Sequence, residues 1–124
     1  MAAWRGNLIN RLIENDYVDG EIKVGTGVTE LCWSDRHAYF ITDIIKNKKG
    51  EIRELELEGA WLKAIPNSYG YYEISREPKE GYFQNSSSKF RIKKNRKGYF
   101  TSDGTVKGTT FRIGKADEYM DPSF

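Results

Sequence analysis

Only one histidine and one cysteine are available for nucleophilic or metal chemistry, His37 and Cys32. They lie five positions apart, in a segment that we expect to be extended. Side chains separated by an odd number of positions in a strand point to opposite faces, so the spacing argues against a Cys–His nucleophile pair. The sequence has no C-x-x-C pair, no second histidine and no H-E-x-x-H segment, and so gives almost no support for a zinc site. We therefore expect no metal, no cofactor and no enzymatic activity.

The basic residues are concentrated in the later part of the chain. Residues 89–115 contain nine basic side chains and one acidic side chain, a net charge of +8, whereas the whole chain carries +2. Cations beside exposed rings suit a phosphate and a stacked base. The pattern predicts a surface that binds an anionic ligand; the alternative is ordinary surface charge, with most of the rings in the core. The aromatic residues interleaved with the cations are Tyr82, Phe83, Phe90, Tyr99, Phe100 and Phe111.

Other polar segments have simpler readings. The glutamates of residues 51–58 alternate with apolar residues, as in a strand with one solvated face that protects a sheet edge. The segment 31–40 (LCWSDRHAYF) places Trp33, Arg36 and Tyr39 around a Ser-Asp turn signal, which fits either a hairpin turn or a binding role. Gly25-Thr26-Gly27 lacks the rest of a nucleotide-binding fingerprint and indicates a turn or a bulge.

A helix is expected at the start of the chain, over residues 1–15. Its apolar residues recur at helical spacing, and an Asp19-Gly20 turn signal follows. A helix of this length needs a partner for its apolar stripe, because it is marginally stable alone. The stripe consists of Trp4, Leu8, Ile9, Leu12 and Ile13.

Strand patterns dominate from residue 21 onward. The clearest is a hairpin in which residues 37–46 and 51–58 flank an Asn-Lys-Lys-Gly turn. Gly, Asn, Ser, Asp and Pro separate further short strands, at the interval of a meander or small barrel. We expect a single α+β domain over residues 1–124, with the N-terminal helix followed by a mainly antiparallel sheet. The further strands are expected over residues 60–65, 71–75, 81–84, 89–94, 99–102 and 109–113.

The chain offers few signals for its compartment. A single cysteine excludes an intrachain disulfide, which favours a reducing environment. The first ten residues lack a cationic start followed by a long apolar run, and no segment approaches 18 apolar residues. We expect a cytoplasmic protein with no membrane contact.

Three stretches together resemble a family of small phage proteins, the first described family of Thoeris anti-defence proteins. They are residues 25–37 (GTGVTELCWSDRH), 111–114 (FRIG) and 118–124 (EYMDPSF). The resemblance implies a sponge that sequesters glycocyclic ADP-ribose, a bacterial immune signal, without cleaving it. It also implies a hexameric homo-oligomer with separate sites for cyclic oligonucleotides.

The matching stretches suggest ligand-binding residues. In this picture Phe83 stacks on the adenine, Arg91 and Arg112 pair with the diphosphate, and Asn85 or Asn95 bonds a base edge or ribose hydroxyl. Arg36 and Tyr82 complete the set. A second site or subunit interface would use Arg5, Asn7, Arg11, Lys107 and Lys115. Two other functions remain open: a small nucleic-acid-binding module, whose affinity would fall steeply with salt, and a protein inhibitor of phage origin.

Overall fold

The computed structural model describes residues 22–32, 35–68, 70–86 and 88–119 of the 124-residue chain. Every regular element in these ranges is a strand, and all paired strands are antiparallel. The strands are β1 (Gly27–Leu31), β2 (Arg36–Lys46), β3 (Ile52–Gly59), β4 (Trp61–Ala64), β5 (Tyr72–Ser75), β6 (Phe83–Gln84), β7 (Phe90–Lys94), β8 (Phe100–Thr101) and β9 (Thr110–Ile113).

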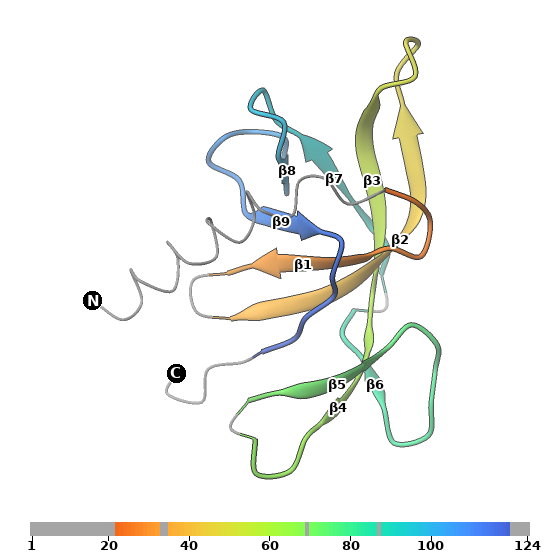
Figure 1. Ribbon diagram of the computed structural model, residues 1–124, viewed down its shortest axis with the longest axis vertical. Coiled ribbons are helices and arrows are strands. Elements are labelled where there is room, and N and C mark those ends of the chain that lie inside the picture. Colours follow the sequence, from red (N-terminus) through yellow and green to blue (C-terminus); the bar gives the residue numbers. More distant parts are fainter. Residues whose placement is uncertain (1–21, 33–34, 69, 87, 120–124) are drawn as a thin grey trace, which may run out of the picture.

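Six of these strands form a closed barrel in the order β1-β2-β3-β7-β8-β9, because β9 returns to pair with β1. The other three form a small sheet in the order β5-β4-β6. Figure 1 shows the small sheet beyond the lower side of the barrel, with β4 continuing the path of β3. The β2–β3 hairpin projects from the opposite side. Closure removes the exposed edges that an open meander would leave.

The α+β prediction is wrong for this part of the chain. The described residues contain no helix, and therefore no helix long and apolar enough to cross a membrane. The helix expected over residues 1–15 lies outside the described residues, and so do Arg5, Asn7 and Arg11. The strands themselves were readable because apolar residues alternate along them, but closure into a barrel depends on pairing between β1 and β9, which are distant in the sequence.

Alternation along the strands creates two apolar layers. The barrel interior holds nine buried side chains, among them Ile41, Leu57 and Ile92, all fully buried. The other face of β2 carries Ala38 and Phe40, which pack with residues of the small sheet in a second cluster. Strand β2 therefore contributes to both clusters. Its odd-numbered residues Tyr39 and Ile41 pack inside the barrel, and its even-numbered residues pack the small sheet against the outside of the barrel.

Two turns have the same construction. The hairpin expected around residues 47–50 is confirmed: Asn47 Oδ1 accepts hydrogen bonds from the backbone N–H groups of Lys49 and Glu51. Asn95 Oδ1 does the same for residues 97 and 99, between β7 and β8. Each turn has a glycine with positive φ, Gly50 at 82° and Gly98 at 89°, a conformation that costs glycine little. Both turns expose basic side chains at their tips.

A short C-terminal segment, residues 115–119, crosses the outside of the barrel after β9 (Figure 1). Thr29 Oγ1 donates to the Lys115 carbonyl at 2.7 Å and accepts from the Asp117 N–H at 2.9 Å. The backbones of Arg36 and Tyr119 exchange two hydrogen bonds. A Cβ at Gly27 would meet the Ala116 nitrogen at 2.4 Å, so this close approach requires glycine. The segment thereby brings Glu118 onto β2.

Candidate functional sites

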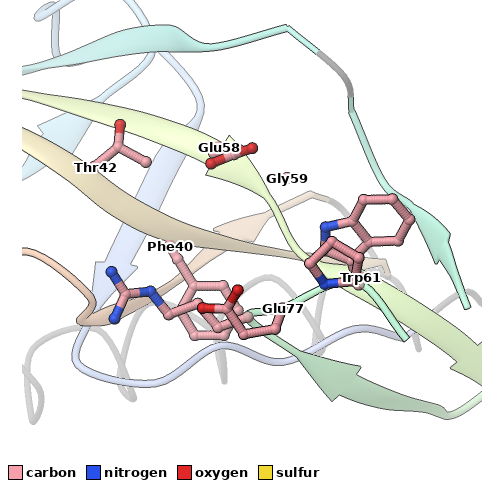
Figure 2. Close-up of a pocket in the computed structure, with 8 residues that line it drawn as sticks. Phe40, Thr42, Glu58, Gly59, Trp61 and Glu77 are labelled. Carbon is pink, nitrogen blue, oxygen red and sulfur yellow. The ribbon is translucent and has the colours of Figure 1, made fainter.

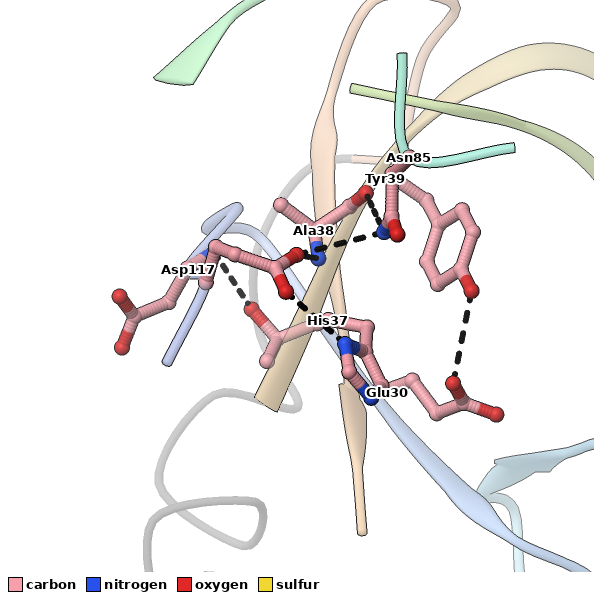
Figure 3. A network of polar contacts seen from close by, with 8 residues as sticks. Glu30, His37, Ala38, Tyr39, Asn85 and Asp117 are labelled. Atoms are coloured by element: carbon pink, nitrogen blue, oxygen red, sulfur yellow. Dashed lines mark hydrogen bonds and ion pairs between the residues drawn. The ribbon is translucent and has the colours of Figure 1, made fainter. Parts of the chain in front are cut away.

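The first candidate site is a polar network centred on Glu118. The Glu118 side chain is 3% exposed. Its Oε1 accepts hydrogen bonds from the Ala38 N–H at 2.8 Å and Asn85 Nδ2 at 3.2 Å, and its Oε2 lies 2.9 Å from His37 Nδ1. Figure 3 shows these bonds, which link β2 and the residue after β6 to the C-terminal segment. A buried carboxylate with three donors is well compensated, so the network ties three distant parts of the chain together.

His37 faces a second partner, Cys32. The expectation that these two side chains point apart was wrong, because β1 and β2 pair antiparallel and Cys32, which directly follows β1, lies on the same side of the hairpin as His37 on β2. Glu30 and His37 are cross-strand partners, and Cys32 closes the hairpin with a hydrogen bond from its N–H to the Asp35 carbonyl. The ligand atoms of Glu30, Cys32 and His37 all lie within 4.8 Å of one another. This trio is the one group in the described part of the chain that could hold a metal ion.

The environment of His37 favours its charged form. Hydrogen bonds to Cys32 and to the Glu118 carboxylate raise the pKa of His37 from 6.5 to about 10, against the opposing effect of burial. Tyr39, whose hydroxyl lies 3.4 Å from Glu30 Oε1, has a raised pKa because burial and the nearby carboxylates disfavour the phenolate.

We predict that the metal-free protein loses stability as pH rises. A raised pKa means that His37 stabilises the fold fully below its unfolded-state value near 6.5, and that this contribution disappears as pH approaches 10. Urea denaturation across this range, in buffer with a chelator, measures the effect. The difference between wild type and His37→Gln isolates the histidine from other titrating groups. A constant difference across the range would contradict the prediction.

The second candidate site is an open hollow at the loop after β8. It has a volume of about 360 Å³ and is lined by Arg96, Gly104, Thr105, Val106 and Lys107. Internal bonds hold this loop: Thr101 Oγ1 donates to the Thr105 carbonyl at 2.9 Å and accepts from the Gly104 N–H at 3.0 Å. The loop packs against β7, since a Cβ on Gly104 would lie 3.0 Å from the Lys93 Cβ. The β7–β8 turn and the loop after β8 thus each contribute one cation to the hollow, Arg96 and Lys107.

One acid lies beside this hollow, Asp103. Its Oδ1 accepts hydrogen bonds from the Thr105 N–H at 2.9 Å and the Thr105 hydroxyl at 2.8 Å, and these bonds lower its pKa. The carboxylate is therefore ionised and engaged in shaping the loop. Three cations outnumber this one carboxylate, so the hollow has a net positive charge. They are Arg96 and Lys107 in the lining and Lys93 next to the loop.

A third hollow lies between the barrel and the small sheet (Figure 2), with a volume of about 240 Å³. Its lining combines the rings of Phe40 and Trp61 with Arg76 and two carboxylates, Glu58 and Glu77. The two acids outnumber the one cation, which disfavours a phosphate here. Flat uncharged or cationic groups fit this lining better than an anion does. Its full lining is Phe40, Thr42, Glu58, Gly59, Trp61, Arg76, Glu77 and Pro78.

Cross-strand pairing reduces the positive charge predicted for residues 89–115. The acidic strand β3 is not a sheet edge; it lies beside the basic strand β7, with Glu54 opposite Lys93 and Glu56 opposite Arg91. Lys89 Nζ also lies 4.0 Å from Glu56 Oε1. Opposite charges facing each other across two strands support the sheet and partly cancel. The cations left for a ligand are mainly those at the turn tips and around the loop hollow.

The seven residues expected to bind ligand do not meet at one place. Arg36 contacts Asp117 at 3.7 Å, and Asn85 belongs to the Glu118 network. Asn95 forms the β7–β8 turn, beside the loop hollow. Arg91 is exposed on β7, whereas Arg112 is 4% exposed and lies across from Thr29.

Phe83 begins strand β6 of the small sheet, and Tyr82 directly precedes it. The Tyr82 hydroxyl donates to Glu73 at 2.8 Å, and Phe83 is 52% exposed with its ring packed edge-on against Tyr72. Of the residues expected at a second site, Lys107 lines the loop hollow and Lys115 is exposed in the C-terminal segment.

Comparisons with protein families, curated proteins and solved structures found no match. Function must therefore be argued from these sites. Sequence reasoning missed Glu30 and Glu118, although Glu-x-Cys two positions apart, followed by a Ser-Asp turn and a histidine, was a usable signal for a clustered hairpin. Glu118 carried no local signal, because it reaches His37 from 81 positions away.

Proposed function

We propose that this chain is a binding protein for a phosphate-bearing ligand of the nucleotide class, which it holds without cleaving. The observation that carries the proposal is the loop hollow, which is lined by Arg96 from the β7–β8 turn and by Lys107 from the ordered loop after β8. A guanidinium fork and an ammonium group suit phosphate oxygens, and a pre-ordered loop lowers the entropy lost on binding. The neighbouring Asn95 orders the turn that carries Arg96.

The resemblance to the Thoeris anti-defence family supplies the specific form of the proposal. The ligand is glycocyclic ADP-ribose or a cyclic oligonucleotide, the protein acts in the host cytosol during phage infection, and copies of the chain assemble as a homo-oligomer. Native mass spectrometry of the protein with each candidate signal measures the number of subunits and the mass of the captured ligand together. Recovery of an unchanged ligand after heating supports sequestration, and recovery of a cleaved product contradicts it.

Neutralising the loop hollow should weaken binding. We predict that Arg96→Ala combined with Lys107→Ala lowers affinity for the captured nucleotide about tenfold or more, because each charge-assisted hydrogen bond contributes about 1.5–3 kcal/mol. Isothermal titration calorimetry measures the change. The matched control is Lys48→Ala with Lys49→Ala, which removes two cations from the similarly built turn at residues 47–50. An equal loss in both pairs would show that general charge, rather than this hollow, holds the ligand.

The second candidate function is nucleic-acid binding, favoured by the openness of the hollow and by the exposed cations of the β7–β8 turn. A polyanion would follow such a surface and release counterions on binding. Titration of a single-stranded oligonucleotide at several salt concentrations separates the two functions. Tight oligonucleotide binding with a steep salt dependence, and no binding of the cyclic nucleotides, would replace the first proposal.

A further inference from the structure

The hairpin between β1 and β2 assembles three different metal-ligating side chains. Glu30 and Cys32 are two positions apart along the strand path, so they project to the same side. His37 lies opposite Glu30 in the β1–β2 register. A carboxylate oxygen, a thiol sulfur and an imidazole nitrogen come within 4.8 Å of one another, with partial exposure at each residue. All three ligands come from one hairpin whose pairing the barrel fixes.

This donor set suits a borderline divalent cation. Zinc binds cysteine sulfur, histidine nitrogen and carboxylate oxygen at about 2.0–2.3 Å, usually with tetrahedral geometry, so its ligand atoms lie about 3.5 Å apart. Closing the trio from its present spacing requires movements of about 1 Å, within the reach of side-chain rotation. Three protein ligands leave a fourth position for water or an external ligand, and the partial exposure of the trio keeps that position accessible.

The surroundings of His37 match those of a metal-bound histidine. Its Nδ1 lies 2.9 Å from Glu118 Oε2, and Glu118 is itself held by the Ala38 N–H and by Asn85 (Figure 3). This bond keeps a proton on Nδ1, so a metal ion would bind at Nε2 and displace the second proton of the charged ring. Carboxylates commonly orient metal-binding histidines in this way. Glu30 is steadied similarly by the Tyr39 hydroxyl at 3.4 Å.

We propose that Glu30, Cys32 and His37 bind a zinc ion, with Glu118 as the residue that positions His37. The same atoms also suggest a nucleophilic thiol, with His37 as base and Glu118 as the third member. Glu30 decides between the two. It supplies a third ligand of a type that zinc binds and that a thiol–histidine nucleophile does not use, and a divalent cation is attracted by the carboxylate and by the thiolate alike.

Cobalt(II) tests the site in the tag-free 124-residue chain. Because Cys32 is the only cysteine in the sequence, any thiolate-to-cobalt charge-transfer band reports on this site alone. We expect one cobalt per chain, displaced by an equivalent of zinc. Cys32→Ser should abolish the band, and Glu30→Gln should weaken cobalt affinity. Glu118→Gln should weaken it by about 10–100-fold, as expected for an orienting carboxylate. The exposed Glu80→Gln serves as the matched control and should bind as the wild type does.

A measurement on the wild type keeps the test independent of variant folding. Stoichiometric zinc should slow alkylation of Cys32 by iodoacetamide and raise the thermal unfolding temperature. Rapid alkylation that zinc does not affect, without a cobalt–thiolate band, would overturn the metal site and favour the nucleophile. Equal weakening of cobalt binding by Glu80→Gln and Glu30→Gln would also overturn it, because binding would then depend on general surface charge.

Discussion

Glu118→Ala is expected to lower the free energy of unfolding by about 3 kcal/mol or more. The substitution removes the acceptor for the Ala38 N–H, for Asn85 and for the charged His37, and it leaves these donors without a partner around a position that is 3% exposed in the native protein. Removing one partner of a buried charged network costs the desolvation of the groups that remain. Urea denaturation of metal-free protein at neutral pH measures the loss.

The neighbouring residue provides the control for this prediction. Asp117 contacts Arg36 at 3.7 Å, and both side chains are about one quarter exposed. Asp117→Ala should cost less than about 1 kcal/mol, as is usual for a solvent-accessible ion pair. If the two variants were destabilised equally, the Glu118 network would be no more important than a surface contact. Glu118→Gln should fall between them, because the amide oxygen still accepts hydrogen bonds but the charge opposite His37 is gone.

Leu57→Ala is expected to destabilise the barrel by about 2–5 kcal/mol. Leu57 is fully buried in the barrel core and faces Ile41 on β2 and Phe90 on β7 in the strand register. Alanine removes apolar contacts with both neighbouring strands and leaves a cavity that a closed barrel has little freedom to fill. Thermal or urea denaturation measures the effect.

A second residue of the same strand tests whether the faces of β3 are assigned correctly. Arg53 is exposed near the beginning of β3. Arg53→Ala introduces the same alanine into the same strand without opening a core cavity, and it should change stability by no more than about 0.5 kcal/mol. A cost at Arg53 similar to that at Leu57 would contradict the inward and outward assignment of this strand.

Local patterns determined much of the strand structure. Alternating residues predicted the β2–β3 hairpin, and Asn-Lys-Lys-Gly predicted its turn, because side-chain periodicity and positive-φ glycine act over a few neighbouring residues. The same local reasoning indicated the positions of the later strands, whose observed counterparts are β4 to β9. The α+β prediction was wrong for the described residues, which contain only strands. The helix that it included lies outside them, and the closure of the strands into a barrel depends on the long-range pairing of β1 with β9.

The candidate sites were less predictable. Asn95 was expected at a ligand, and the structure shows it ordering a turn through two hydrogen bonds that the sequence alone does not reveal. Arg91 belongs to a strongly basic stretch, yet it faces Glu56 on the adjacent strand. A charge excess counted along the chain therefore overstated the positive field in space, because strand pairing brings acidic and basic segments together.

The sequence by itself indicated strands β2 to β9 and the basic turn at residues 47–50, and it shows that a single cysteine and a single histidine are present. Only the tertiary structure decided that these two residues meet and that Glu118 joins them. The physical reason is range: backbone preferences and side-chain alternation are local, whereas a reactive cluster depends on hairpin register and on contacts between residues far apart in the chain.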